Sequence, residues 1–293
     1  MSEFPIKKIS RNEVGFPPAF NELHDPPKLF YYRGDQRLLT RPGVAVVGTR
    51  RASEHGLIVA RDFSEALARA GFVIVSGLAF GIDAAAHEGS LAAGGATVAV
   101  LGSGIDDASI YPRANLSLAI RILARGGVII SENPPGTRPQ QWDFPKRNRL
   151  IAALAAATVI VEAPEKSGAV ITAKYALELG RDVYVVPADA LRESALGSNR
   201  LLVDGAPPLV SPFDLIKNLG GIPPEIDDVA VRPHNQNEVL ILNALKKNRH
   251  HVDELIAATG LPASIVMSTV TGLELRGAIF DEGAMNYALR RGQ

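Results

Sequence analysis

The hydrophobic pattern of the chain divides the sequence into a large α/β region and a small helical region. Between about residues 42 and 219, short runs of continuous apolar residues alternate with longer segments whose apolar residues recur at helical spacing. Continuous apolar runs are typical of strands that are buried on both faces of a parallel sheet. The runs predict strands at Val44–Val47, Phe72–Ser76, Thr97–Leu101, Val128–Ser131, Thr158–Glu162 and Val183–Val186.

The segments between these runs predict helices, so that strand and helix alternate through the region. This alternation is typical of an α/β protein with a doubly wound, mostly parallel sheet. Ligands of such sheets bind beyond the carboxyl ends of the strands, and the loops there are the first place to search for function. The predicted helices are Ser53–Ala70, Ile82–Ala93, Ala114–Arg125, Arg147–Ala156 and Ala169–Leu179.

The flanking segments differ from this pattern. Residues 1–41 are mixed and proline-rich, which predicts an N-terminal arm that packs on the main domain, 42–219. Residues 220–236 are rich in Gly, Pro and acidic residues without periodicity, as in a linker. Residues 237–293 hold three helical patterns and a short hairpin, which predict a small winged-helix-like domain.

The composition excludes several classes of protein. Lys and Arg together number 31, as do Asp and Glu, so the chain is not a generally basic nucleic-acid binder, although a local basic groove is compatible with it. The chain has no cysteine, which excludes disulfides and fits a reducing cytoplasm. It shows no signal core and no apolar run long enough to span a bilayer, so we expect a cytoplasmic protein without a membrane partner.

The first predicted strand ends in a turn formed by Gly48, Thr49 and Arg50, and a helix follows it. Backbone N–H groups at the start of a helix favour an anion. Gly48 allows a ligand to approach the backbone, and Arg50 adds a positive charge. The pattern predicts a phosphate-binding turn, although it matches neither the dinucleotide G-x-G-x-x-G motif nor the Walker motif. A plain strand-to-helix turn is the alternative.

A cluster of cations follows an aromatic residue where the sheet is expected to present its ligand-binding edge. Single-stranded nucleic acid is bound by such a mixture, because cations contact phosphates and an aromatic ring stacks on a base. The alternative is a solvated run of charge beside a buried ring. Trp142 is a possible second stacking residue. The cluster consists of Phe144, Lys146, Arg147, Asn148 and Arg149.

A second candidate anion site lies at Ser167 and Gly168, directly before a predicted helix that contains Thr172. Two such sites on neighbouring loops, together with the cations of the cluster, would hold successive phosphates of one strand. A mononucleotide would need only one site. The spacing of these loops therefore favours a polynucleotide ligand.

No residue pattern predicts catalysis or a metal site. Asp83 and His87 lie four residues apart on one predicted helix, and we interpret them as capping and bracing residues of the fold. No Ser/His/Asp constellation and no H-E-x-x-H motif is present. The last predicted helix, from Pro262, is mostly apolar, which disfavours duplex recognition and favours a protein contact or self-association. We expect no catalytic residue, no metal and no cofactor.

Several motifs in this order resemble those of the DNA-processing protein A family (DprA/Smf). They are GTR, SGLAFGIDAAAH, SENPPGT, FPKRNRLIAAL, SGAVITA and GSNRLLVDGA within about residues 27–216, and VDELIAATGL in the C-terminal region. The resemblance implies an extended Rossmann-like fold that binds single-stranded DNA and forms a homodimer. It also implies protection of incoming DNA and loading of the RecA recombinase in natural transformation. Many members begin with a helical domain, whereas this chain begins with a short arm.

The resemblance also implies which residues contact DNA. They are Gly48, Thr49 and Arg50 of the GTR turn, then Phe144, Lys146, Arg147, Asn148 and Arg149, with Ser167, Gly168 and Thr172. The alternative is an enzyme similar to the nucleoside-monophosphate phosphoribohydrolases, which share this type of sheet. Their catalytic glutamate would fall at Tyr175 here, which argues against that activity. A duplex-specific regulator is a third alternative, which the uncharged last helix disfavours.

Overall fold

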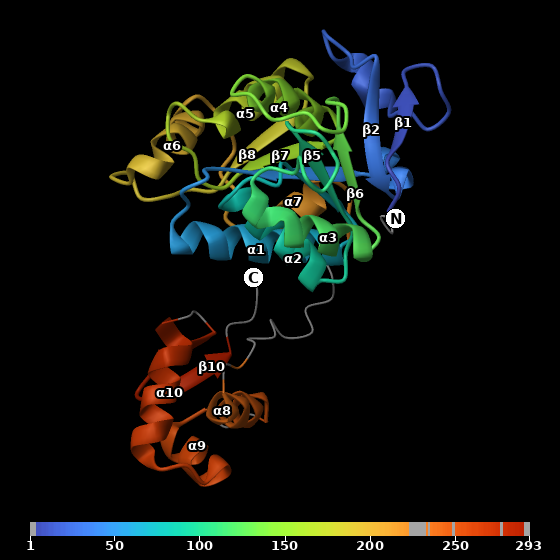
Figure 1. Ribbon diagram of the computed structural model, residues 1–293. Helices are drawn as coiled ribbons and strands as arrows, with labels where there is room; N and C mark the ends of the chain where they lie inside the picture. Colours follow the sequence, from blue (N-terminus) through green and yellow to red (C-terminus); the bar gives the residue numbers. More distant parts are fainter. Residues whose placement is uncertain (1–3, 223–232, 234, 248–249, 276–277, 290–293) are drawn as a thin grey trace. The chain divides into compact units, whose positions relative to one another are not determined.

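A computed structural model describes residues 4–222, 233, 235–247, 250–275 and 278–289 of the chain. The chain divides into two compact units, Met1–Pro224 and Glu225–Gln293, and each is described by itself (Figure 1). The predicted linker, 220–236, lies largely outside the described residues, so the predicted domain boundaries stay predictions.

The first unit is built on one eight-stranded sheet with the order β1-β2-β6-β5-β4-β3-β7-β8. The six predicted strands form its parallel part, which confirms the predicted doubly wound α/β fold. These strands are almost wholly buried, as their continuous apolar sequences require. They are β3 (Gly43–Val47), β4 (Val73–Ser76), β5 (Thr97–Leu101), β6 (Val128–Ser131), β7 (Ala157–Ile160) and β8 (Asp182–Val185).

The N-terminal residues extend this sheet. β2 (Leu29–Gly34) pairs antiparallel with β6, and β1 (Lys7–Ser10) pairs antiparallel with β2 to form the edge. Between them Phe20 packs edge-on against Phe30, with ring centroids 5.6 Å apart. The N-terminal segment therefore belongs to the hydrophobic core of the first unit.

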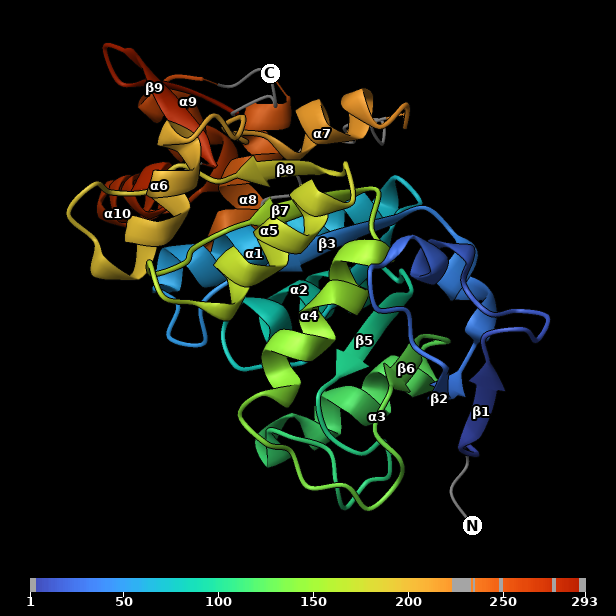
Figure 2. The same cartoon turned by 90° about the horizontal axis from the view of Figure 1, so that it is seen from above.

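Helices cover both faces of the sheet (Figures 1 and 2). One layer holds α1 (Glu54–Arg69), α2 (Ile82–Ala92), α3 (Leu116–Ala124) and α7 (Pro212–Asn218). The other holds α4 (Asp143–Ala153), α5 (Gly168–Glu178) and α6 (Leu196–Val203). Short 3-10 helices lie at Pro18–Glu22, Gln36–Thr40, Arg113–Asn115 and Glu193–Ala195.

Two features of these helices differ from the prediction. α4 begins at Asp143 instead of Arg147, because Pro145 lies in the first turn, where a missing N–H costs no hydrogen bond. Phe144 and Lys146 consequently lie on the helix and not on a loop before it. α6 and α7 were not predicted, since each is shorter than three turns and gives little periodic signal.

The strand order places a topological switch point between β3 and β7. These strands are parallel neighbours, yet β3 leads into α1 on one face and β7 leads into α5 on the other (Figure 1). A crevice forms at such a point because the two connections leave the sheet in opposite directions. The carboxyl ends of β3 and β7 are therefore the standard place for a ligand in this fold.

The second unit combines three helices with a two-stranded hairpin, as predicted for a winged helix. Its core is formed by apolar residues of all three helices and the hairpin, including Leu245, Leu255, Val270 and Ile279. The helices are α8 (Gln236–Lys246), α9 (Val252–Thr259) and α10 (Ala263–Leu275). The hairpin strands are β9 (Ile279–Gly283) and β10 (Asn286–Leu289).

Among the described residues, no single helix has the length and apolar character needed to cross a membrane. The bent pair Val252–Thr259 and Ala263–Glu274 meets that test only when its two helices are taken together, by length and composition.

Candidate nucleic-acid interface

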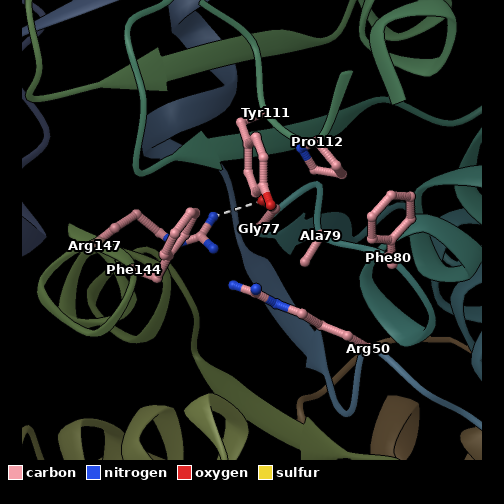
Figure 3. Close-up of a pocket in the computed structure, with 8 residues that line it drawn as sticks. All are labelled: Arg50, Gly77, Ala79, Phe80, Tyr111, Pro112, Phe144 and Arg147. Atoms are coloured by element: carbon pink, nitrogen blue, oxygen red, sulfur yellow. Dashed lines mark hydrogen bonds between the residues drawn. The ribbon is translucent and has the colours of Figure 1, made fainter. Parts of the chain in front are cut away.

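A pocket opens at the carboxyl ends of β3, β4 and β5, beside the start of α4 (Figure 3). Its residues come from four segments that are distant in the sequence, because neighbouring parallel strands end at the same edge of the sheet. The lining residues are Arg50, Gly77, Ala79, Phe80, Tyr111, Pro112, Phe144 and Arg147. The prediction had singled out Arg50, Phe144 and Arg147 among them.

The pocket mouth consists of Arg50, Phe80, Tyr111 and Phe144. The guanidinium carbon of Arg50 lies 4.7 Å from the centroid of the Phe144 ring, within the range of a cation–π contact. The rings of Tyr111 and Phe144 lie 5.7 Å apart at 45°. Arg50 is exposed, and Phe80 and Tyr111 are 45% and 44% exposed. The mouth thus offers solvent a positive charge and aromatic rings side by side.

The pocket floor consists of Gly77 and Arg147, and Asp83 lies behind it. Nη1 of Arg147 donates to the carbonyl oxygen of Gly77 at 2.7 Å (Figure 3). It also donates to the carbonyl oxygen of Val100. Burial lowers the pKa of Arg147 to about 10, so its guanidinium still carries a charge at neutral pH. A guanidinium at this place ties the ends of β4 and β5 together.

Asp83 holds the loop after β4, which contains Gly77 and Ala79. Its Oδ2 accepts hydrogen bonds from the backbone N–H groups of Gly77, at 3.1 Å, and Ala79, at 3.4 Å. Burial raises the pKa of Asp83, while the Arg147 charge and these N–H groups act against that rise. A side chain at Gly77 would displace the Arg147 guanidinium, since its Cβ would lie 2.4 Å from Nη1 of Arg147.

His87 is buried beside the pocket floor and makes a hydrogen bond inside the protein. Its Nδ1 lies 2.7 Å from Oγ1 of Thr97, which donates to the Ile74 carbonyl, so Nδ1 carries the proton and the ring is neutral. Burial, reinforced by the nearby Arg147 charge, lowers the pKa of His87 from 6.5 to about 3. Among the described residues, no group of three His, Cys, Asp or Glu side chains could hold a metal ion.

Like Arg147, three further predicted DNA contacts have internal partners. Nδ2 of Asn148 and Oγ1 of Thr172 both donate to the Gly168 carbonyl, at 2.9 and 3.0 Å. Arg149 is 6% exposed, and its Nη2 lies 2.8 Å from each carboxylate oxygen of Glu132. A direct phosphate contact by these side chains stays a prediction that would require them to change partners.

The remaining predicted residues of this region are open to solvent. Lys146 and Gly168 are exposed, and Ser167 is partly exposed. Ser167 caps α5, because its Oγ accepts the N–H of Val170 at 3.3 Å. The bond from Asn148 to Gly168 joins α4 to the start of α5, so Ser167 lies on the same rim of the sheet as the pocket.

A carboxylate of the protein lies beside the predicted phosphate-binding turn at the start of α1. Oε2 of Glu162 accepts hydrogen bonds from the backbone N–H of Ser53, at 3.0 Å, and from its hydroxyl, at 2.9 Å. The backbone N–H of Thr49 donates to the Glu162 carbonyl at 2.7 Å. A carboxylate of the protein itself therefore occupies the donors of Ser53 beside this turn, and phosphate contacts by Gly48 and Thr49 stay a prediction. Gly48 and Thr49 serve this arrangement, and only Arg50 of the GTR turn reaches the pocket.

Sequence reasoning missed Phe80, Tyr111 and Glu162 as parts of the site. Phe80 and Tyr111 lie in loops that follow predicted strands, and Glu162 ends one, but nothing in the sequence shows which of these residues face one another. Glu162 was placed at the end of a strand without a partner, because its partner Ser53 is 109 positions earlier in the chain.

The fold and the site define a two-unit protein in which a Rossmann-like unit precedes a winged helix. A family model described as DNA recombination-mediator protein A matches residues 7–220, and one described as the DprA winged helix domain matches residues 216–282. The chain therefore belongs to the DprA/Smf family.

Two members of this family are similar in sequence to most of this chain. The chain is 36% identical to protein Smf of Synechocystis sp., over 96% of this chain and 80% of that one. It is 40% identical to the DNA processing protein DprA of Bacillus subtilis, over 73% of this chain and 71% of that one.

Solved structures show the same fold. The crystal structure of DNA processing protein A from Streptococcus pneumoniae has a TM-score of 0.68 and 38% identity, and each chain is covered to 74%. DNA processing protein A from Helicobacter pylori, whose structure concerns its mode of binding single-stranded DNA, has a TM-score of 0.66 and 34% identity. That match covers 74% of this chain and 96% of the other.

Proposed function

We propose that this protein binds single-stranded DNA at the pocket, without chemical catalysis, protects incoming strands and loads a RecA-type recombinase on them in natural transformation. The observation that carries the proposal is the contact of Arg50 with Phe144 at the pocket mouth, beside Tyr111. Unpaired bases stack on aromatic rings, and phosphates are neutralised by guanidinium groups, so this combination suits a single strand.

The family supports the choice of ligand. The Helicobacter pylori relative binds single-stranded DNA, and its fold matches the first unit of this chain. The neutral overall charge of the chain requires a local site, and the pocket is one. Homodimer formation, the recombinase partner and a cytoplasmic location belong to the proposal as expectations from the family and from the lack of cysteine.

The proposal is tested with an oligothymidine strand in a fluorescence anisotropy titration. We expect Arg50→Ala to weaken binding about tenfold and to lower the salt dependence of the affinity by about the contribution of one phosphate. The reason is that Arg50 is the exposed guanidinium at the pocket mouth.

Arg51→Ala is the matched control. Arg51 is the exposed neighbour of Arg50 and does not line the pocket, so we expect its removal to change the affinity by less than about threefold. Equal losses for both variants would show that general surface charge, and not the pocket, binds the strand. Failure of the parent protein to bind the strand would refute the proposed function.

A further inference from the structure

Ligands of this fold usually bind in the crevice between β3 and β7, and in this protein the side chain of Glu162 lies there. Glu162 follows the end of β7 and is 2% exposed. Its Oε2 accepts both Ser53 hydrogen bonds at the first turn of α1, and its Oε1 accepts the hydroxyl of Ser194. The carboxylate thus has three donors in a closed site.

The surroundings of the carboxylate are built for an anion. Ser53 caps α1, with its Oγ accepting the N–H of Gly56 at 3.0 Å, so the positive end of the helix dipole faces Glu162. Nη1 of Arg192 donates to the same Oγ at 2.7 Å and brings a positive charge to the site. This set of donors resembles what Rossmann-like proteins offer to a phosphate.

Gly56 packs closely against the carboxylate of Glu162. A Cβ on Gly56 would lie 2.2 Å from Oε2 of Glu162, so any larger residue would displace the carboxylate. Gly48 has the same role beside the backbone, since its Cβ would lie 2.8 Å from the Glu162 carbonyl oxygen. Gly56 therefore makes room for the Glu162 carboxylate, and Gly48 makes room for the Glu162 backbone and for the side chain of Ile82.

We propose that Glu162 is a built-in replacement for a bound phosphate and that it excludes free mononucleotides from the switch point of the sheet. Glu162 is then a specificity-determining residue. It holds the start of α1 in its ligand-bound geometry permanently, and a nucleotide phosphate cannot enter against a buried carboxylate. Ligands are left to the pocket beside it. The inference concerns the α1 site alone and does not depend on single-stranded DNA being the ligand of the pocket.

The test is chemical rescue in Glu162→Ala. This substitution removes the Cγ and the carboxylate, which together have the shape of acetate, and it leaves the Ser53, Ser194 and Arg192 donors in place. We expect the variant to melt at a lower temperature than the parent. About 100 mM acetate or inorganic phosphate should raise its Tm by about 3–6 °C more than chloride of the same ionic strength.

Glu162→Gln is the matched control, because it removes the charge but fills the space. We expect it to be destabilised and to gain no more from acetate or phosphate than from chloride. In the parent protein, acetate and phosphate should not raise the Tm beyond the effect of chloride. Adenosine monophosphate should raise the Tm of Glu162→Ala more than it raises that of the parent. Where Glu162→Ala does not fold in chloride, its refolding yield from urea is compared between acetate and chloride, and a clear gain in acetate is expected.

Two results would overturn the proposal. One is a parent protein that gains as much from phosphate or adenosine monophosphate as Glu162→Ala does, because the site would then be open in the parent. The other is a Glu162→Ala protein whose Tm or refolding yield is the same in acetate, phosphate and chloride. Both results are measured without DNA, so neither depends on whether the proposed binding of single-stranded DNA is correct.

Discussion

The floor and the mouth of the pocket each hold an arginine, but the two side chains have opposite surroundings. Arg147 on the floor is 6% exposed and donates to strand-end carbonyls, whereas Arg50 at the mouth is exposed and lies over a ring. Charge alone therefore does not identify a ligand contact. The floor residues maintain the structure of the pocket, whereas the exposed side chains of the mouth can contact a ligand.

This difference separates stability from affinity. Substitutions in the floor are expected to reduce the free energy of unfolding, because they leave buried polar groups without partners. Substitutions in the mouth are expected to reduce ligand affinity with little effect on folding, because exposed side chains contribute little to stability. The predictions below test this separation, in order of decreasing expected effect.

The largest effect is expected for Arg147→Met. The change keeps much of the volume but removes the donors of the Gly77 and Val100 carbonyls and leaves the buried carboxylate of Asp83 without its neighbouring positive charge. Each buried acceptor that is left without its donor costs about 1–3 kcal/mol, and two carbonyl oxygens lose theirs here. Urea unfolding followed by circular dichroism measures the loss.

Arg50→Ala is the matched control for this measurement, and it should change the free energy of unfolding by less than about 0.5 kcal/mol. A loss below about 1 kcal/mol for Arg147→Met would mean that the floor is not held by this guanidinium, and the division between floor and mouth would fail.

The next effect is a pH dependence of stability caused by His87, which lies beside the floor. Its pKa is about 3 in the folded protein and 6.5 in an unfolded chain, so the unfolded state binds the proton first as the pH falls. The His87 contribution is complete above pH 6.5 and is lost progressively below it. Between about pH 7.5 and pH 5 the parent should lose about 2 kcal/mol from this residue.

His87→Asn isolates this contribution, because other groups titrate in both proteins. The difference in free energy of unfolding between parent and variant should shrink by about 2 kcal/mol over that range. A difference that stays constant with pH would show that His87 can become protonated in the folded protein.

How far the sequence predicts this molecule depends on whether the signal is local. The six parallel strands were predicted because each buried strand is a continuous apolar run, as in Val44–Val47. The capping of α5 was signalled by Ser167, since a cap involves residues three apart. Arg147 and Arg149 were predicted alike as phosphate contacts, because a sequence shows their charge and not their partners.

The partners of those arginines are distant in the sequence. Arg147 donates to Gly77 and Val100, and Arg149 pairs with Glu132, and the pairs are set by the order of strands in the sheet. The same holds for Glu162 and Ser53. Fold class and the position of the candidate site were therefore within reach of the sequence, whereas the distinction between buried and ligand-facing charges needed the structure.

At the mouth, Phe144→Ala should weaken oligothymidine binding by about 1–3 kcal/mol, which is the usual contribution of one stacked base. The ring also supports the Arg50 guanidinium, so its removal affects both contacts. Phe144→Tyr keeps the ring and should bind within about twofold of the parent. An equal loss in both variants would indicate that Phe144 supports the fold and not a base, and the melting temperatures of the variants would then fall together.

The smallest effect concerns Trp142, the single tryptophan of the chain, which precedes α4 and is 69% exposed. A strand that extends from the mouth along the start of α4 should stack on this ring and quench its fluorescence. Trp142→Phe should keep the affinity within about twofold, while Trp142→Ala should lower it by about 1 kcal/mol. Fluorescence that stays unchanged when anisotropy shows saturation would mean that the strand leaves the mouth in another direction, toward Phe80.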